Sequence, residues 1–196
     1  MSQRFYKLSS IFISPRDLVI QDGLVGYVSD YAEGSPVDAI VEKGELDLMQ
    51  ALVACLMIAR GYRALHAIKV LHCDVRENNI RIAVSASDGS VHVYVLDCDG
   101  VSAPAGLSPT NTVGARRYFA PELSLALKQG VSTIPTEATE CYSLAVIFHE
   151  LLTLRHPLTG YDDSPEAIHD VICRGKWLYL YTGSEGPAFI VYTAYL

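Results

Sequence analysis

The stretch HCDVRENNI at residues 72–80 decides how the rest of this 196-residue sequence is interpreted. It places an acid, a cation and an amide at fixed offsets, as Asp74, Arg76 and Asn79. Apolar side chains flank the stretch on both sides, so the polar cluster lies between two hydrophobic anchors. A loop pinned to a core in this way commonly carries catalytic groups, although a solvated turn between two elements fits the same pattern.

The overall composition limits the class of protein. A chain of 196 residues has room for one ordinary domain, or for one domain with a remnant of another. Half of the residues are hydrophobic, so the chain can bury a sizeable core. The net charge of −7 and the pI near 5.3 argue against a protein that grips nucleic acid or an acidic membrane surface. We therefore expect neither nucleic acid nor membrane among its partners.

The lack of a recognisable targeting signal and the pattern of cysteines predict a reducing compartment. Residues 1–7 lack the apolar segment of a secretory signal, and no stretch reaches the roughly 18 apolar residues of a membrane span. The longest apolar run, residues 51–59, stops at Arg60 and is interpreted as part of a buried helix. The five cysteines are scattered, odd in number and without a CxxC pair, which argues against a disulfide framework or a structural zinc site. A reduced, cytoplasmic protein is expected.

Two hairpins are predicted from β-rich runs and their turns. Residues 12–34 predict two strands joined at Asp22-Gly23, a dipeptide typical of tight hairpin turns. Residues 80–97 predict a second hairpin, with its turn over 87–90. The final stretch, 177–196, is apolar but has no clean period, and it predicts no particular element.

Helical periodicity dominates the rest of the chain. We predict a short helix over 36–43 and a long one over 45–66, followed by helices over 121–128, 139–154 and 166–174. The long helix should bury one broad face, because apolar residues recur along it at helical spacing. The residues expected on this buried face are Leu48, Leu52, Cys55, Leu56 and Ala59.

A second polar feature, LDCDG at residues 96–100, ends the second hairpin. Because that hairpin begins at Asn79 and ends at Asp97, the two side chains can return to the same place. An amide oxygen beside a carboxylate suits Mg²⁺, which usually keeps water and substrate phosphates as its other ligands. Asp74 can then face the same site as a base, and Arg76 adds positive charge for a transferred phosphate.

The motifs together resemble the catalytic core of the protein kinase family. Ordered matches at suitable spacings cover residues 28–158, whereas each match by itself would be weak. The "D-x-D" form of the second motif resembles a divergent bacterial or phage-type branch. The matches are residues 28–34 with the adenine-holding strand and hinge, 72–79 with H-R-D-x-K-x-x-N, 97–99 with D-F-G, 113–122 with V-G-T-x-x-Y-x-A-P-E, 140–146 with D-x-x-S-x-G-V, and 156–158 with H-P-F.

This resemblance implies an α+β, protein-kinase-like fold. Residues 1–34 would be a remnant of the small lobe, comprising its last two strands and the hinge. Residues 35–196 would be the mainly helical large lobe, truncated at its C-terminal end. The rest of the small lobe would then belong to a longer chain or be supplied by another one.

The resemblance also implies an activity that depends on ATP and Mg²⁺. The γ-phosphate would move to a hydroxyl of a protein substrate, with Ser or Thr favoured over Tyr. Asp74 would be the base that orients the hydroxyl, and Arg76 would neutralise the γ-phosphate. Asn79 and Asp97 would hold Mg²⁺ on the nucleotide phosphates.

Other positions take their expected roles from the same resemblance. The backbone at Asp30 and Ala32 would pair with the adenine edge. Arg81 lies where an apolar side chain usually forms the floor under adenine. Glu140 would brace the backbone of the catalytic loop.

The largest departure from the family pattern concerns the region before the hinge. No G-x-G-x-x-G precedes residue 32, and Lys7 has no V-A-I-K context. The chain by itself could therefore be inactive, and a catalytically dead binding or scaffold module is the alternative. A small-molecule kinase of the same superfamily fits less well, because residues 120–122 keep the whole A-P-E motif.

Overall fold

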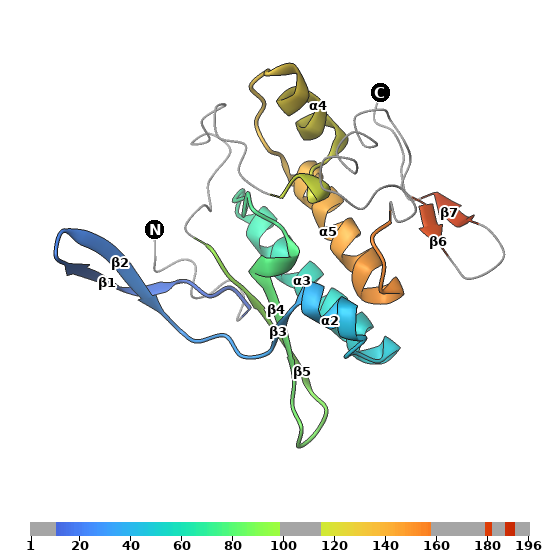
Figure 1. The fold of residues 1–196 in the computed structure, drawn as a ribbon, viewed down its shortest axis with the longest axis horizontal. Helices are drawn as coiled ribbons and strands as arrows, with labels where there is room; N and C mark the ends of the chain where they lie inside the picture. The colour runs from blue at the N-terminus through green and yellow to red at the C-terminus, as the bar shows by residue number, and fades with distance from the viewer. Residues whose placement is uncertain (1–10, 99–114, 158–178, 182–186, 191–196) are drawn as a thin grey trace.

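The computed structural model describes residues 11–98, 115–157, 179–181 and 187–190, which form a hairpin, a small sheet and a helical body (Figure 1). In chain order its elements are β1 (Pro15–Gln21), β2 (Leu24–Ser29), β3 (Ser35–Pro36), α2 (Val37–Lys43), α3 (Leu48–Ala67), the 3₁₀ turn η1 (Glu77–Asn79), β4 (Ile80–Val84), β5 (Val91–Val95), the 3₁₀ turn η3 (Arg116–Tyr118), α4 (Pro121–Gln129), α5 (Glu137–Thr153), β6 (Tyr179–Tyr181) and β7 (Pro187–Ile190).

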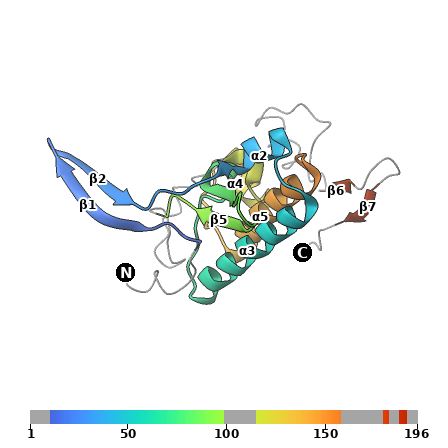
Figure 2. The same cartoon turned by 90° about the horizontal axis from the view of Figure 1, so that it is seen from below.

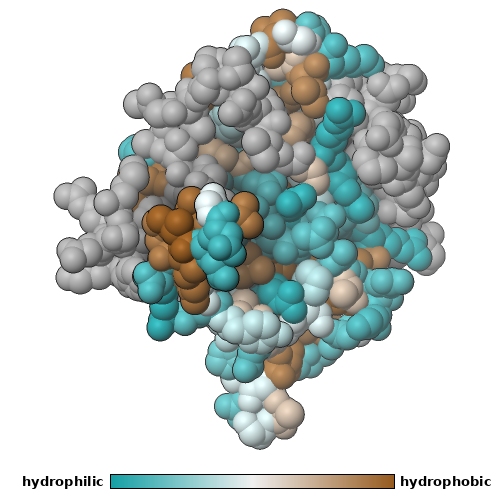
Figure 3. Space-filling view, turned by 60° about the vertical axis from the view of Figure 1, so that its left-hand side comes forward, coloured by the Kyte–Doolittle hydropathy of each residue, from teal (hydrophilic) through white to brown (hydrophobic). Residues whose placement is uncertain are grey.

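The first hairpin, β1–β2, is confirmed and projects away from the helices in both views (Figures 1 and 2). Asp22 and Gly23 both have positive φ, 52° and 80°, as a tight two-residue hairpin turn requires. Directly paired residues of an antiparallel hairpin share a face, so Leu18↔Tyr27 and Ile20↔Val25 lie together. These side chains are exposed, and Figure 3 shows hydrophobic side chains gathered left of centre, where the hairpin faces the viewer.

A three-stranded sheet in the order β3–β4–β5 carries the second predicted hairpin. Residues preceding β1 extend this sheet, because Phe12 forms a parallel bridge with Val95 and the N–H of Ile13 donates to the Val95 carbonyl at 2.8 Å. Gly61 of α3 leaves room for the Ile11 side chain, since a Cβ there would lie 2.2 Å from Ile11 Cδ1. The start of the described chain is thereby held between β5 and α3.

Helix α3 begins at a capping box in which Asp47 and Gln50 exchange side-chain and backbone hydrogen bonds. The predicted buried face is wrong for its leucines, because Leu48, Leu52 and Leu56 are 63%, 44% and 49% exposed. The face that packs carries smaller residues as well as large ones. Its buried members are Ala51, Ala54, Ile58, Gly61, Tyr62 and Leu65.

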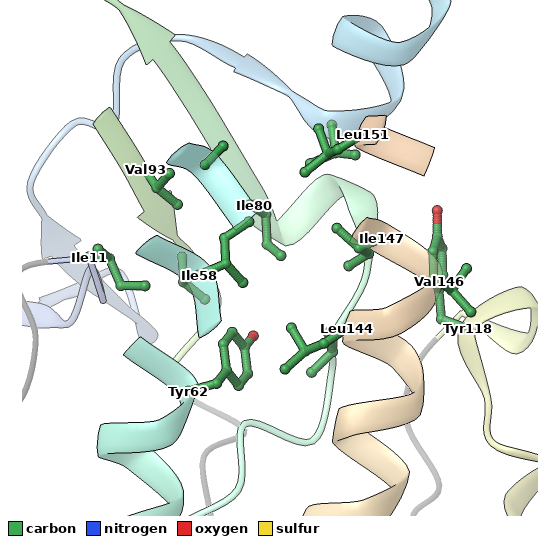
Figure 4. Close-up of a cluster of buried hydrophobic side chains, with 14 of the residues drawn as sticks. Ile11, Ile58, Tyr62, Ile80, Val93, Tyr118, Leu144, Val146, Ile147 and Leu151 are labelled. Carbon is green, nitrogen blue, oxygen red and sulfur yellow. The ribbon is translucent and has the colours of Figure 1, made fainter. Parts of the chain in front are cut away.

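The core lies where α3, β4 and α5 meet (Figure 4). Ile58 and Tyr62 of α3 lie near Ile80 of β4 and Ile147 of α5, and each is no more than 1% exposed. Helix α5 starts two residues before its predicted beginning, because Thr136 and Thr139 form a capping box that sets its first turn. Burial of this cluster fixes the ends of α3 and β4, and therefore the loop between them.

The structure also bears on the expected absence of a membrane span and on the C-terminal segments. Helix α3 is long and apolar enough to cross a membrane by length and composition, contrary to the expectation of no span-length stretch. One face of the helix packs against α5 and β5, and a helix from a protein core can pass the same test of length and composition. The helix predicted over 166–174 lies outside the described residues, and β6–β7 form a short hairpin that the sequence did not predict.

Candidate functional site

The loop between α3 and β4 is anchored by buried side chains at both ends, as the sequence predicts. Leu71 and Ile80 are fully buried, and so is His72. His72 Nδ1 accepts a 3.4 Å hydrogen bond from the Asp74 backbone N–H, so Nε2 carries the proton and donates to the Leu96 carbonyl at 2.9 Å. This histidine therefore ties the loop to the segment that follows β5.

Asp74 lies at the centre of the loop with only 7% of its surface exposed. Its Oδ2 accepts a hydrogen bond from Asn79 Nδ2 at 2.8 Å and lies 3.1 Å from Arg76 Nε. The arginine contact is one of charge rather than an aligned hydrogen bond. The other oxygen, Oδ1, is buried and has no hydrogen-bond partner among the described residues. One oxygen of this carboxylate is thus fixed by side chains of the loop, whereas the other is buried without such a partner among the described residues.

Asn79 and Asp97 are brought together by the backbone. The second amide hydrogen bond of Asn79 runs from Nδ2 to the Asp74 carbonyl at 2.9 Å, which orients its side chain. The Leu96 N–H donates to the Asn79 carbonyl at 2.8 Å, and Asp97 follows with a left-handed φ of 58°. The backbone therefore brings the two ends of the hairpin together, and the convergence of the two side chains stays a prediction.

Glu140 on α5 supports the loop between α3 and β4. It is 3% exposed, and its Oε1 accepts a 2.6 Å hydrogen bond from the backbone N–H of Cys73. Cys73 itself has a left-handed φ of 70°, so the brace holds the loop where its backbone is unusual. Glu140 Oε2 lies 2.7 Å from His66 Nε2 of α3, a partner that sequence reasoning missed.

A second buried polar cluster holds the segment around η3 against α5. Tyr118 Oη donates to Glu150 Oε2 at 2.8 Å, and Arg117 Nη2 lies 2.7 Å from Glu150 Oε1. Ser143 Oγ donates to the Tyr118 carbonyl at 2.7 Å. Burial outweighs the arginine and raises the pKa of Glu150 to about 7. Sequence reasoning missed Glu150, although Ser143 and Glu150 lie seven residues apart on one helix and share a face.

The predicted hinge residues connect β2 to β3. Ala32 is 6% exposed, whereas Asp30 is an exposed residue whose carboxylate pairs with Arg16. Within the described chain, the backbone groups of residues 30–33 make no hydrogen bond to other backbone groups. These N–H and C=O groups can therefore meet the edge of a ligand.

The donor set fits a divalent ion only in part. No group of three His, Cys, Asp or Glu side chains in the described residues is placed to hold a metal. Asn79 and Asp97 supply an amide and a carboxylate, which suits Mg²⁺ when phosphates and water complete its shell.

A family model and several curated proteins match most of the chain. The protein kinase domain model matches residues 8–182. The probable serine/threonine-protein kinase CPE1738 of Clostridium perfringens is 29% identical over 154 residues, which are 78% of this chain and 21% of that protein. The serine/threonine-protein kinase PkaB of Streptomyces coelicolor is 28% identical over 155 residues, covering 76% of this chain and 36% of that protein.

A solved structure shares the fold at lower identity. The Cydia pomonella granulovirus kinase PK-1 matches with a TM-score of 0.64 and 17% identity, over 85% of this chain and 58% of that one. The chain thus spans about a fifth to a third of the curated relatives named above.

Proposed function

Because the chain belongs to the protein kinase family and has its α+β fold, we propose that it is a phosphotransferase. The γ-phosphate of ATP would be transferred to a serine or threonine hydroxyl of a protein substrate. We choose serine and threonine over tyrosine because the relatives named above are serine/threonine-protein kinases by name. The observation that carries the proposal is the half-satisfied carboxylate of Asp74.

Asp74 is suited to orient a hydroxyl and accept its proton. Asn79 and Arg76 fix the Oδ2 side, while Oδ1 is buried without a partner among the described residues. A buried acceptor that is left unpaired costs about 1–3 kcal/mol, and a ligand that donates to Oδ1 would remove that cost. A substrate hydroxyl that donates to Oδ1 would be aligned for attack on phosphorus.

Asn79 and Asp97 are the residues that would hold Mg²⁺. Asn79 spends its amide N–H groups on Asp74, which turns the amide oxygen toward other ligands. When bound, the ion supplies charge neutralisation on the nucleotide phosphates. The hydrogen bond from Leu96 to Asn79 keeps the two ligands adjacent.

Arg76 would meet the transferred phosphate. Its side chain is 36% exposed, so the guanidinium is held beside Asp74 without being enclosed. A cation fixed next to the base can offset the charge that develops on the phosphoryl oxygens. At the hinge, the backbone groups of Asp30 and Ala32 would pair with the adenine edge.

A non-enzymatic binding module is the second candidate. The described residues before Asp30 form β1–β2 and a segment along β5, and none of them forms a glycine-rich phosphate loop. A scaffold has no need for the half-satisfied Asp74, however, and that feature favours the enzyme.

Thermal unfolding in the presence of nucleotide tests the proposal. Mg·ATP at millimolar concentration should raise the melting temperature, and Asp97→Ala should remove that shift. Glu42→Gln, an exposed carboxylate on α2, is the matched control and should keep it. A shift that is absent in the wild-type protein would exclude ATP-dependent activity for this chain.

A further inference from the structure

The outer face of the N-terminal half of α3 is apolar and exposed. Its members are Leu48, Met49, Leu52, Val53 and Leu56, which are 63%, 68%, 44%, 39% and 49% exposed. The other face of the helix packs against α5 and β5, and α3 runs along the lower edge of the helical body in Figure 2. Single apolar side chains are normal on a protein surface, whereas a contiguous group of this size usually marks an interaction site.

These residues follow the spacing of a seam between two helices. Met49, Leu52 and Leu56 recur at intervals of three and four, so they lie along one stripe of the helix surface. Arg60 and Arg63 continue the stripe at the same spacing, and both are exposed. Neither arginine forms an ion pair with another described residue. A partner that fits this stripe therefore offers apolar side chains followed by acidic ones.

The beginning of α3 carries the matching acidic groups. Glu45 and Asp47 directly precede the helix, and both are exposed. Asp47 caps the helix, whereas the printed partner of Glu45 is the exposed Lys43 at 3.3 Å. A second copy of α3 that lies antiparallel to the first would bring these carboxylates to Arg60. Parallel pairing would instead place arginine against arginine, so charge favours the antiparallel arrangement.

We propose that this stripe is the interface of a two-fold symmetric dimer, in which α3 of one copy packs antiparallel on α3 of another. With the symmetry axis beside Leu52, Met49 of each copy meets Leu56 of the other. The same register brings Glu45 to Arg60, because the residue numbers of the two pairs have the same sum. A contact around a two-fold axis needs one self-complementary patch, and this stripe pairs apolar with apolar and acid with base.

The size of the stripe indicates a reversible dimer. Its five apolar side chains supply only part of the roughly 800 Å² that a stable interface buries on each partner, and the charged residues at its ends supply a polar rim. The population of the dimer should therefore depend on protein concentration. The loop that carries Asp74 follows the opposite end of α3, so the inference concerns a different surface and does not rest on the proposed function.

Sedimentation velocity across a concentration series tests the dimer. The wild-type protein should change from one copy to two as its concentration rises. Leu52→Glu places two like charges beside the symmetry axis and should weaken association by more than about 100-fold. Ile20→Glu changes an exposed apolar residue on the β1–β2 hairpin, so it is the matched control and should keep the wild-type dissociation constant. Circular dichroism checks that both variants are folded.

An exchange of charges tests the antiparallel register. Arg60→Glu should weaken dimerisation by about 3- to 10-fold, and adding Glu45→Arg to the same chain should restore it. A double variant that associates no better than Arg60→Glu overturns this arrangement.

Two further outcomes would overturn the dimer itself. The first is wild-type protein that stays monomeric at every concentration, and if it then co-sediments with phosphatidylcholine vesicles, the stripe belongs to a lipid surface. The second is association that Ile20→Glu abolishes and Leu52→Glu leaves intact, which would assign self-association to the hairpin.

Discussion

The backbone N–H of Cys73 donates to Glu140 Oε1 at 2.6 Å, which joins the loop between α3 and β4 to helix α5 across 67 residues of sequence. The other oxygen of Glu140 reaches His66 on α3. One buried carboxylate thus connects the loop with both helices that support it. The position of Asp74, the next residue after Cys73, depends on this connection.

Replacing Glu140 should therefore destabilise the fold. In Glu140→Ala, the buried N–H of Cys73 and the ring of His66 lose their partner, at a cost of about 3 kcal/mol. Urea unfolding measures this change. Glu137→Gln on the same helix affects an exposed carboxylate, so it should leave the unfolding free energy nearly unchanged. Equal effects of the two variants would contradict the bracing role.

Glu150 should make stability depend on pH. Burial raises its pKa in the folded protein to about 7 from an ordinary value of 4.5, so the folded state binds the proton more tightly. This contribution is fully present below pH 4.5 and is lost as the pH rises toward 7. In this range the free energy of unfolding should fall by at most about 1.4 kcal/mol per pH unit. The free energy of unfolding of the wild-type protein and of Glu150→Gln is measured across this pH range. The difference between the two curves isolates the contribution of Glu150, and a difference that does not change with pH would refute the prediction.

His156 should show the opposite dependence. Its Nε2 lies 3.3 Å from the Arg117 carbonyl, and burial lowers its pKa to about 4 from 6.5. A depressed pKa gives stability that is present above pH 6.5 and is lost as the pH falls toward 4. The free energy of unfolding of His156→Gln is compared with that of the wild-type protein between these two pH values. The variant should lose less stability on acidification than the wild-type protein does.

The close contact of Gly34 with β4 predicts a sensitive position. Alanine at residue 34 would have an unfavourable φ and a Cβ 2.2 Å from a backbone oxygen, which should cost about 3 kcal/mol. Gly23 has a similar φ of +80° with open space around it, so Gly23→Ala should cost only about 1 kcal/mol. Chemical denaturation of both variants compares them. A cost at Gly34 no greater than at Gly23 would show that the backbone adjusts.

Asp74→Asn tests the proposed base directly. The amide cannot accept the hydroxyl proton, so kcat should fall by about 100- to 10,000-fold. Affinity for Mg·ATP should change little, because the proposed metal ligands and hinge are intact. Transfer of labelled phosphate to a protein substrate measures the first quantity and calorimetry the second. Wild-type turnover by this variant would remove Asp74 from the mechanism.

The sequence predicts those parts of the fold that depend on short-range patterns. Both hairpins are predicted because their turn residues and strand alternation are local, and Asp22-Gly23 adopts the expected positive φ values. Helix positions also follow from periodicity. The sequence does not predict which face of α3 is buried. The helix carries apolar residues along two faces, and both sets recur at helical spacing. The packed stripe includes Ala54 and Gly61, which allow close approach of the neighbouring segments.

The amino-acid sequence by itself determined the order and spacing of the proposed site residues Asp74, Asn79 and Asp97. These residues lie at the ends of local elements, and a hairpin necessarily returns its two ends to one place. Only the tertiary structure decided what supports them. Glu140 and Glu150 each bind groups more than 30 residues away, at Cys73 and Tyr118. A buried carboxylate is satisfied by whichever donors packing brings to it, and that packing is set by the whole core.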